Sequence, residues 1–291
     1  MATISQWVHG ARPRTLPAAV APVVIGTGAA AQIDSARAPE ALLALVVALA
    51  LQVGVNYAND YSDGIRGTDS AHRRVGPVRL VGQQLAPPRQ VKLAAFACFG
   101  IAALAGLLLT WLSGAWIMLA LGAASIVAAW FYTGGSRPYG YQGLGEIFVF
   151  VFFGLVATLG TTYTQALTLT GPALAGAIGV GCLSCAILMA NNLRDIPGDT
   201  VVGKRTLAVR LGDRWSRVAY CLLLAVAAQC VFIAADSGLG ALWAMAAFVL
   251  AIPPVRRIVT GATGADLIPV LSGTGLLTLA YAVLLAAGLA L

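Results

Sequence analysis

Charged side chains are scarce in this chain. They make up 10% of its 291 residues, whereas 59% of the residues are hydrophobic. Soluble globular domains carry about 25% charged residues, so the composition excludes a soluble fold. Apolar runs long enough to cross about 30 Å of hydrocarbon recur along the whole sequence. The composition therefore predicts an all-α, polytopic membrane protein without a soluble domain.

Histidine and cysteine are also few. His9 and His72 stand where interfacial or loop residues are expected, and no Ser-His-Asp or Cys-His arrangement typical of nucleophilic catalysis is present. The five cysteines all fall inside apolar runs, which is typical of buried thiols. We therefore expect a chemistry that needs no covalent enzyme intermediate.

The apolar runs predict nine transmembrane helices around a central cavity, within a single domain over residues 1–291. Two polar segments, at about 60–90 and 194–215, are expected to form cap loops over this cavity. Their similar placement is compatible with a pseudo-repeat of two halves. The expected spans are residues 16–32, 41–58, 91–112, 114–133, 145–166, 172–192, 216–235, 239–255 and 267–290.

Basic residues are distributed very unevenly between the two sides of the expected bundle. Arg37 is the only Lys or Arg on one side, so the positive-inside rule places the N-terminus and both cap loops in the cytoplasm and the C-terminus outside. A basic face of this kind attracts membrane lipids with anionic headgroups and anionic substrates. Nucleic acid is not an expected partner, because the charges flank apolar spans and no nucleic-acid-binding motif is present.

Two aspartate clusters follow the second and sixth expected spans. Asn56, Asp60 and Asp63 are spaced i, i+4, i+7, which places their side chains on one helical face. Asn192, Asp195 and Asp199 are spaced i, i+3, i+7, with the same consequence. An ionised carboxylate at membrane depth is costly unless it is paired or binds a metal. The sequence therefore predicts that the two faces meet across a cavity.

Mg²⁺ with a bound diphosphate explains such paired clusters, since Mg²⁺ is usually held by a few carboxylates together with substrate phosphates. A single Asn-Asp pair would more simply cap a helix or face a loop, but two matching clusters on one membrane side favour the metal site. A cation-coupled transporter is the alternative from another class. The basic candidates for the diphosphate are Arg66, Arg73, Arg74, Lys204 and Arg205.

These clusters resemble the signature motifs of the UbiA superfamily of intramembrane prenyltransferases. Asn59-Asp60-x-x-Asp63 and Asp195-x-x-x-Asp199 match the two motifs, but Gly67 stands at the fourth position of the first, with Asp69 two residues later. The resemblance implies nine helices and Mg²⁺. It implies metal ligation by Asp60, Asp63, Asp69, Asp195 and Asp199, with Asn56, Asn59 and Asn192 joining the basic residues around the diphosphate.

Within the superfamily the chain is most similar to the 1,4-dihydroxy-2-naphthoate polyprenyltransferases of menaquinone biosynthesis. The similar stretches are 11–17 (ARPRTLP), 59–69 (NDYSDGIRGTD), 132–139 (YTGGSRPY) with 143–146 (GLGE), and 191–195 (NNLRD) with 203–207 (GKRTL). This implies transfer of a polyprenyl chain from polyprenyl diphosphate to 1,4-dihydroxy-2-naphthoate, with loss of CO₂, in a bacterial cytoplasmic membrane. Alternative acceptors are 4-hydroxybenzoate, haem, a chlorophyllide or a phosphoribosyl sugar.

Residues outside the clusters are the candidates for the aromatic acceptor. They are Arg12, Arg14, Tyr132, Arg137, Tyr139 and Glu146. The arginines could instead set topology or snorkel to the interface, and Tyr141 is expected in an interfacial aromatic belt. The phenylalanines of 148–153 are most simply lipid-facing or packing residues, although some could line a tunnel for the prenyl tail.

Overall fold

The computed structural model describes residues 2–68 and 78–291, and these residues form helices and connecting turns without any strand. Local backbone hydrogen bonds satisfy the peptide groups in the interior of a helix, which suits a chain this apolar. The α-helices are α1 (Ile4–Gly10), α2 (Pro17–Ala31), α3 (Ala38–Ile65), α4 (Pro88–Ser113), α5 (Ile117–Phe131), α6 (Gly145–Val149), α7 (Ala157–Ala166), α8 (Gly171–Val201), α9 (Leu207–Ala234), α10 (Ile252–Val259) and α11 (Ile268–Ala290).

All nine expected spans coincide with helical segments, but not all have the length of a membrane span. In the described part of the chain, seven helices are long and apolar enough to cross a membrane. The first expected span belongs to a pair, Ile4–Thr15 and Pro17–Ala31, that is bent by 50°. The fourth is α5, a shorter apolar helix. The protein is therefore an all-helical membrane protein, and the count of nine crossings stays a prediction.

The segment expected as a loop at 194–215 is mostly helical. α8 continues through the second aspartate cluster to Val201, and α9 begins at Leu207. The two are joined by a short turn at 202–206, and α9 is broken at Gly212, whose φ of 74° is readily adopted only by glycine. Because α3 also continues to Ile65, both clusters lie on the last turns of long helices, where a helix holds side chains more rigidly than a loop.

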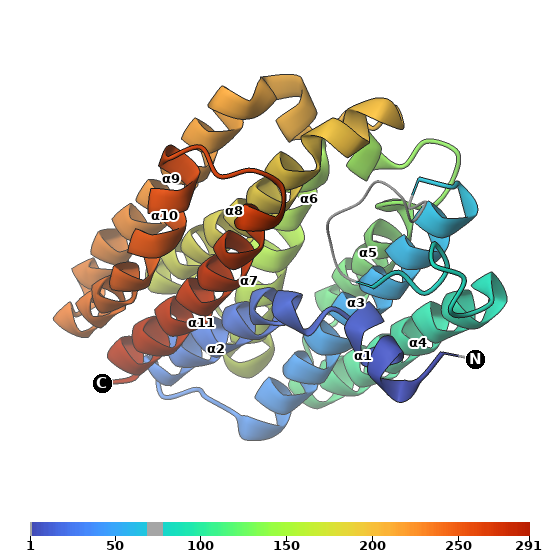
Figure 1. The fold of residues 1–291 in the computed structure, drawn as a ribbon. Coiled ribbons are helices and arrows are strands. Elements are labelled where there is room, and N and C mark those ends of the chain that lie inside the picture. Colours follow the sequence, from blue (N-terminus) through green and yellow to red (C-terminus); the bar gives the residue numbers. More distant parts are fainter. Residues whose placement is uncertain (1, 69–77) are drawn as a thin grey trace.

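The helices form two groups (Figure 1). In one, α2, α7, α8, α9 and α11 enclose a core that includes Leu183, Tyr220 and Tyr281. In the other, α1, α3 and α4 pack around Tyr57, Leu80 and Phe99, with α5 alongside. The aspartate clusters of α3 and α8 therefore belong to different groups.

The span from Gly145 to Ala166 contains a π-helical segment at Phe150–Val156, and such segments often occur at functional sites. It packs tightly on α8. A Cβ atom placed on Gly154 would lie 2.7 Å from the Cα atom of Gly181. Small residues of this kind let membrane helices approach closely. The contact fixes this span against α8, beside the cavity described next.

Candidate active site

A cavity of about 270 Å³ lies between the two groups of helices. One part is polar and holds Asp63, Asp195 and Asp199, whereas the other is lined by small, aliphatic and aromatic residues. Its polar or charged lining residues are Arg12, Thr15, Gln52, Asn56, Asn59, Asp63, Arg79, Ser125, Thr133, Ser184, Asn191, Asn192, Asp195, Asp199, Lys204 and Thr206. The two clusters thus meet at one site, as the sequence predicts.

The face that α3 presents to the cavity differs from the expected one. It carries Gln52, Asn56, Asn59 and Asp63 at spacings of four, three and four residues, which is one stripe of an α-helix. Asp60 is not among the lining residues. The expectation that Asp60 shares the cavity face with Asn56 and Asp63 is therefore wrong for this structure.

Asp60 instead fixes a neighbouring turn. Its Oδ2 accepts a hydrogen bond from the backbone N–H of Leu80 at 2.8 Å, and its Oδ1 accepts one from Val81 at 2.9 Å. The residue before this pair, Arg79, lines the cavity. Two charge-assisted bonds to a side chain that is 1% exposed give the turn a firm anchor. Asp60 therefore contributes to the site by placing Arg79, and its predicted metal ligation stays a prediction.

Asp63 is the aspartate of α3 that faces the cavity, and two residues from distant segments bind it. The hydroxyl of Tyr141 donates to Oδ1, and the Lys204 ammonium lies 3.3 Å from Oδ2. Lys204 also lies over the Tyr141 ring, 4.5 Å from its centroid. Burial and the Asp63 charge raise the pKa of the Tyr141 phenol, so it stays protonated and acts as a donor.

The second cluster has one charge partner on its own helix. Arg194 binds Asp195 through two parallel bonds, Nε to Oδ1 at 2.8 Å and NH2 to Oδ2 at 2.7 Å. The same NH2 group donates to Oδ1 of Asn191 at 2.8 Å. Asp195 and Asp199, one helical turn apart, both line the cavity. This face of α8 therefore presents two carboxylates to the cavity that Asp63 also lines.

The donor set fits Mg²⁺ held together with a diphosphate. It consists of carboxylate and amide oxygens, the ligands that this hard cation prefers, and it includes no cluster of sulfur or imidazole ligands. Among the described residues, no three His, Cys, Asp or Glu side chains lie close enough to hold a metal by themselves. Substrate oxygens would complete the coordination of a bound Mg²⁺, which is how Mg²⁺ is usually held at phosphate sites.

Three more predicted diphosphate residues reach the cavity. Asn59 accepts a hydrogen bond from Thr133 Oγ1 at 2.8 Å, and Asn192 donates to Glu146 Oε1 at 3.0 Å. The third, Asn56, donates to the Ala11 carbonyl at 2.8 Å. Each amide is therefore oriented by a partner on another element.

Other predicted basic residues do not line the cavity. Arg66 is exposed and donates to the carbonyls of Thr133 and Gly135. Arg205 is exposed, and its backbone N–H donates to the Tyr141 carbonyl at 2.9 Å. Arg66 therefore fastens the 133–135 segment, and Arg205 fastens the turn that carries Tyr141. Asp69, His72, Arg73 and Arg74 lie outside the described residues, so their predicted roles stay predictions.

The predicted acceptor residues divide into two sets. Arg12, Tyr132 and Tyr139 line the cavity. Arg14 and Arg137 are exposed and do not line it, which agrees with the alternative of a topological or interfacial role. Glu146 is buried and lies behind Asn192 rather than on the cavity surface. Its contact with Asn192 makes it a positioning residue for the second cluster, and direct acceptor binding by Glu146 stays a prediction.

Sequence reasoning missed some of the residues that complete the site. Tyr141 was expected in an interfacial belt, and this is wrong because its hydroxyl binds Asp63. Arg79, Thr133 and Gln52 were not singled out. The i, i+4, i+7, i+11 stripe that begins at Gln52 is a signal that could have revealed this residue, whereas the contacts of Tyr141, Arg79 and Thr133 depend on tertiary structure.

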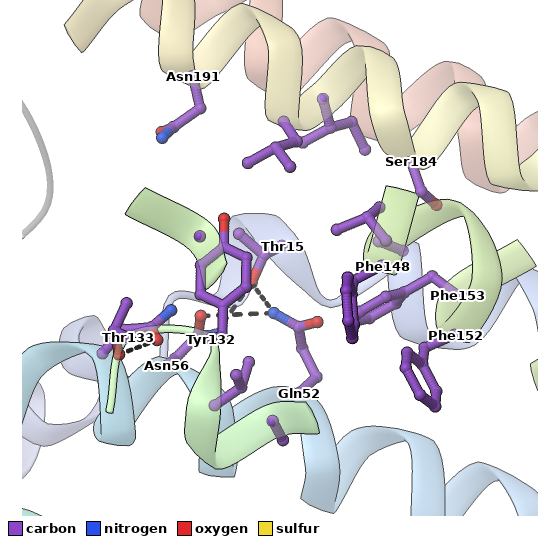
Figure 2. Close-up of a pocket in the computed structure, with 18 of the residues that line it drawn as sticks. Thr15, Gln52, Asn56, Tyr132, Thr133, Phe148, Phe152, Phe153, Ser184 and Asn191 are labelled. Carbon is purple, nitrogen blue, oxygen red and sulfur yellow. Dashed lines mark hydrogen bonds between the residues drawn. The ribbon is translucent and has the colours of Figure 1, made fainter. Parts of the chain in front are cut away.

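The apolar part of the cavity is aromatic. Phe148, Phe152 and Phe153 line it, and Phe148 stacks on Tyr139 with ring centroids 3.8 Å apart (Figure 2). Phe150 packs against the core instead. Three of the four phenylalanines therefore line the cavity, and their contact with a prenyl tail stays a prediction. A prenyl chain or a flat aromatic ring fits such a surface.

Comparison with known proteins agrees with this geometry. Residues 19–266 match the model of the UbiA prenyltransferase family. A 1,4-dihydroxy-2-naphthoate octaprenyltransferase of Mycobacterium tuberculosis is 56% identical, over 100% of this chain and 98% of that relative. The protein of the same description from Escherichia coli is 39% identical, over 85% of this chain and 81% of the relative.

Solved structures show the same fold at low sequence identity. A UbiA homolog from Archaeoglobus fulgidus bound to GPP and Mg²⁺ matches with a TM-score of 0.69 and 12% identity, over 97% of this chain and 99% of that one. The same homolog bound to DMAPP and Mg²⁺ matches with a TM-score of 0.66. The family match covers most of the chain, and the fold agrees. The chain therefore belongs to the UbiA prenyltransferase family.

Proposed function

We propose that this protein transfers a polyprenyl chain from polyprenyl diphosphate to 1,4-dihydroxy-2-naphthoate, releasing diphosphate and CO₂ and forming a demethylmenaquinol, the reduced form of demethylmenaquinone. The observation that carries the proposal is the meeting of Asp63 with Asp195 and Asp199 at the polar end of a cavity whose other end is aromatic. The relatives described as 1,4-dihydroxy-2-naphthoate octaprenyltransferases support this choice of acceptor.

The polar end would bind the diphosphate. Asp63, Asp195 and Asp199 would hold Mg²⁺, which neutralises the charge that develops on the departing diphosphate. Lys204 and Arg79 supply positive charge to the same anion from the turns after α8 and before α4. Asn59 and Asn192 are held by Thr133 and Glu146 and orient the bound oxygens. Preorganised groups of this kind stabilise a developing charge without reorganising during the reaction.

The apolar end would hold the reacting carbons. Phe148, Phe152 and Phe153 exclude water from the allylic carbon while its bond to the diphosphate oxygen breaks. The ring carbon that bears the carboxylate attacks, so that a carbon–carbon bond forms there. The carboxylate then leaves as CO₂, and its bonding electron pair restores the aromatic ring. Arg12 lines the cavity and belongs neither to the two clusters nor to the turn that carries Arg79. It would be the counter-ion for this carboxylate before the reaction.

The orientation in the membrane is part of the proposal. With the basic segments in the cytoplasm, both clusters and the Lys204 turn face the cytoplasm of a bacterium, where anionic substrates are available. Reporter fusions at Leu291 should then give an external signal, because nine crossings bring the C-terminus to the outside. A cytoplasmic signal would mean that the chain crosses the membrane one time fewer. The short helix α5 would then be the one that does not cross.

The reaction can be tested with acceptor that carries ¹⁴C in its carboxylate. Purified protein supplied with polyprenyl diphosphate and Mg²⁺ should release labelled CO₂ in step with formation of the lipid product. EDTA should stop both, and Mg²⁺ should restore both. Label retained in the product, or a preference for 4-hydroxybenzoate, would reject this acceptor while leaving membership of the family unaffected.

A further inference from the structure

The cavity-lining stripe of α3 begins with a buried carboxamide, that of Gln52, at the end farthest from Asp63. Gln52 lies in the middle of the membrane-spanning helix and is 6% exposed, yet it lines the cavity. A buried amide is costly unless its polar atoms are hydrogen-bonded. The orientation of its two polar atoms therefore decides what the cavity offers to a substrate at this point.

A short network fixes that orientation. Asn56 directs its amide nitrogen to the Ala11 carbonyl at 2.8 Å and to Thr15 Oγ1 at 3.1 Å. Thr15 uses its single proton on the Arg12 carbonyl, 2.9 Å away. Its oxygen can therefore only accept further bonds, so Gln52 must direct its amide nitrogen toward Thr15, at 2.9 Å.

The carboxamide oxygen of Gln52 consequently points away from Thr15, toward the side of the cavity where Phe148 and Phe153 lie (Figure 2). No described residue donates a hydrogen bond to it. The oxygen can accept a hydrogen bond but cannot donate one, and it carries no full charge. It therefore suits a neutral O–H or N–H donor and disfavours an anion.

The position of Gln52 narrows the choice of ligand. Gln52 and Asp63 are eleven residues apart on one helix, which corresponds to roughly 16 Å along its axis, so the two cannot share a metal ion. A diphosphate offers no neutral donor, and a prenyl chain offers none at all. A phenolic hydroxyl on a flat ring packed against Phe148 has the required chemistry.

We infer that Gln52 is a specificity-determining residue that accepts a hydrogen bond from one ring hydroxyl of the aromatic acceptor, and that Thr15 and Asn56 are its positioning residues. This inference rests on the proposed function, since it concerns the same acceptor. It also gives a reason for the left-handed backbone of Arg12, which has a φ of 54°. That conformation lets the Ala11 and Arg12 carbonyls bind Asn56 and Thr15.

The test measures equilibrium binding rather than turnover. Wild-type protein in detergent is titrated with 1,4-dihydroxy-2-naphthoate and with the two analogues in which one hydroxyl is replaced by methoxy. One analogue should bind about ten-fold more weakly, because it leaves the buried Gln52 oxygen without a donor. Gln52→Met keeps the length of the side chain and removes the acceptor, so this ten-fold preference should disappear.

A matched control is available on another helix. Gln165 is also a buried glutamine, bound to Thr27 and to the backbone of Arg37, and it does not line the cavity. Gln165→Met should therefore keep the ten-fold preference despite a similar loss of buried hydrogen bonds. Thr15→Val should weaken the preference, since the Gln52 amide is then free to turn over.

The outcomes separate the two proposals. If wild-type protein binds the dihydroxy acceptor but Gln52→Met or, should that variant fail to fold, Thr15→Val keeps the full preference, the role of Gln52 is rejected and the proposed function stands. The same conclusion follows if neither methoxy analogue is discriminated by the wild type. If the wild type binds no dihydroxynaphthoate, the proposed function and the role of Gln52 both fail.

Discussion

The two aspartate clusters look alike in sequence but are held in different ways. On α3, each aspartate takes partners from distant segments. Asp60 binds the backbone of the 80–81 turn, and Asp63 binds Tyr141 and Lys204. On α8, Asp195 is bound by Arg194, its neighbour on the same helix. The α3 cluster thus joins the turns that carry Leu80, Tyr141 and Lys204 to the bundle, whereas Arg194 binds Asp195 from within α8.

The difference shows that aspartates of one motif can have two roles, anchoring a turn and acting at the reacting centre. A carboxylate that anchors a turn should affect the stability of the protein when it is replaced, whereas a carboxylate at the reacting centre should affect turnover. Asp60 belongs to the first kind in this structure. Asp63, Asp195 and Asp199 line the cavity, and we propose that they belong to the second.

The largest expected effect is on turnover. Asp63→Asn, Asp195→Asn and Asp199→Asn should each lower kcat/KM by on the order of 10²–10³-fold, because each removes a negative charge from the Mg²⁺–diphosphate site. Steady-state assays on purified, correctly inserted protein measure this loss. If all three variants kept wild-type rates, these carboxylates would have no part in the reaction.

Asp60→Asn tests the other half of the comparison. Its amide can accept only one of the two N–H bonds from Leu80 and Val81 and leaves the other unsatisfied, at a cost of about 1–3 kcal/mol in the free energy of unfolding. Thermal unfolding in detergent should show a Tm clearly below that of the wild type for Asp60→Asn. An unchanged Tm would show that Asp60 does not anchor the 80–81 turn.

Lys204 links the two clusters, since it follows α8 and binds Asp63 on α3. Lys204→Ala should raise the KM for polyprenyl diphosphate by roughly ten-fold, as expected for loss of one buried charged contact, and should change the KM for the acceptor less. Arg205→Ala is the neighbouring control, because Arg205 is exposed and does not line the cavity. A larger rise in the KM for the acceptor than in the KM for polyprenyl diphosphate would place Lys204 at the acceptor.

Tyr141→Phe should have a smaller effect, of a few-fold on kcat/KM, because Lys204 still binds Asp63 when the hydroxyl is removed. The sign of the pH dependence follows from the raised pKa. The phenol stays protonated up to at least the ordinary tyrosine value of about 10, so the ratio of wild-type to variant rates should be constant below that pH. A ratio that falls between neutral pH and pH 9, roughly one unit below that value, would show that the phenol ionises in the site.

The smallest effect is expected at Arg14 and Arg137. Both are exposed and outside the cavity, so their replacement by Ala should change the KM for the acceptor by no more than about two-fold, typical of surface positions. Arg12→Ala, which removes a lining residue, should raise that KM well beyond this. Equal effects at the three positions would reject the assignment of Arg12 to the carboxylate.

The sequence predicts the helices well because hydrophobic runs directly reflect the solvent of the membrane. It also predicts that Asp63, Asp195 and Asp199 share a site, since helical periodicity fixes the direction of each side chain. Periodicity does not tell what lies opposite that side chain. Asp60 is only three residues from Asp63, but its carboxylate binds the backbone of the 80–81 turn and does not line the cavity. Tyr141 could not be assigned for the same reason, because its partners Asp63 and Lys204 are far away in the sequence.

The central claim is that α3 and α8 bind one Mg²⁺–diphosphate between them. The most direct measurement is equilibrium binding of an unreactive polyprenyl thiodiphosphate with and without Mg²⁺, for the wild type, Asp63→Asn, Asp195→Asn and the double variant. Mg²⁺ should tighten binding to the wild type, each single substitution should abolish most of this gain, and the double substitution should add little more. If either single variant kept the full gain from Mg²⁺, or if the two losses were simply additive, the claim of one shared site would be contradicted.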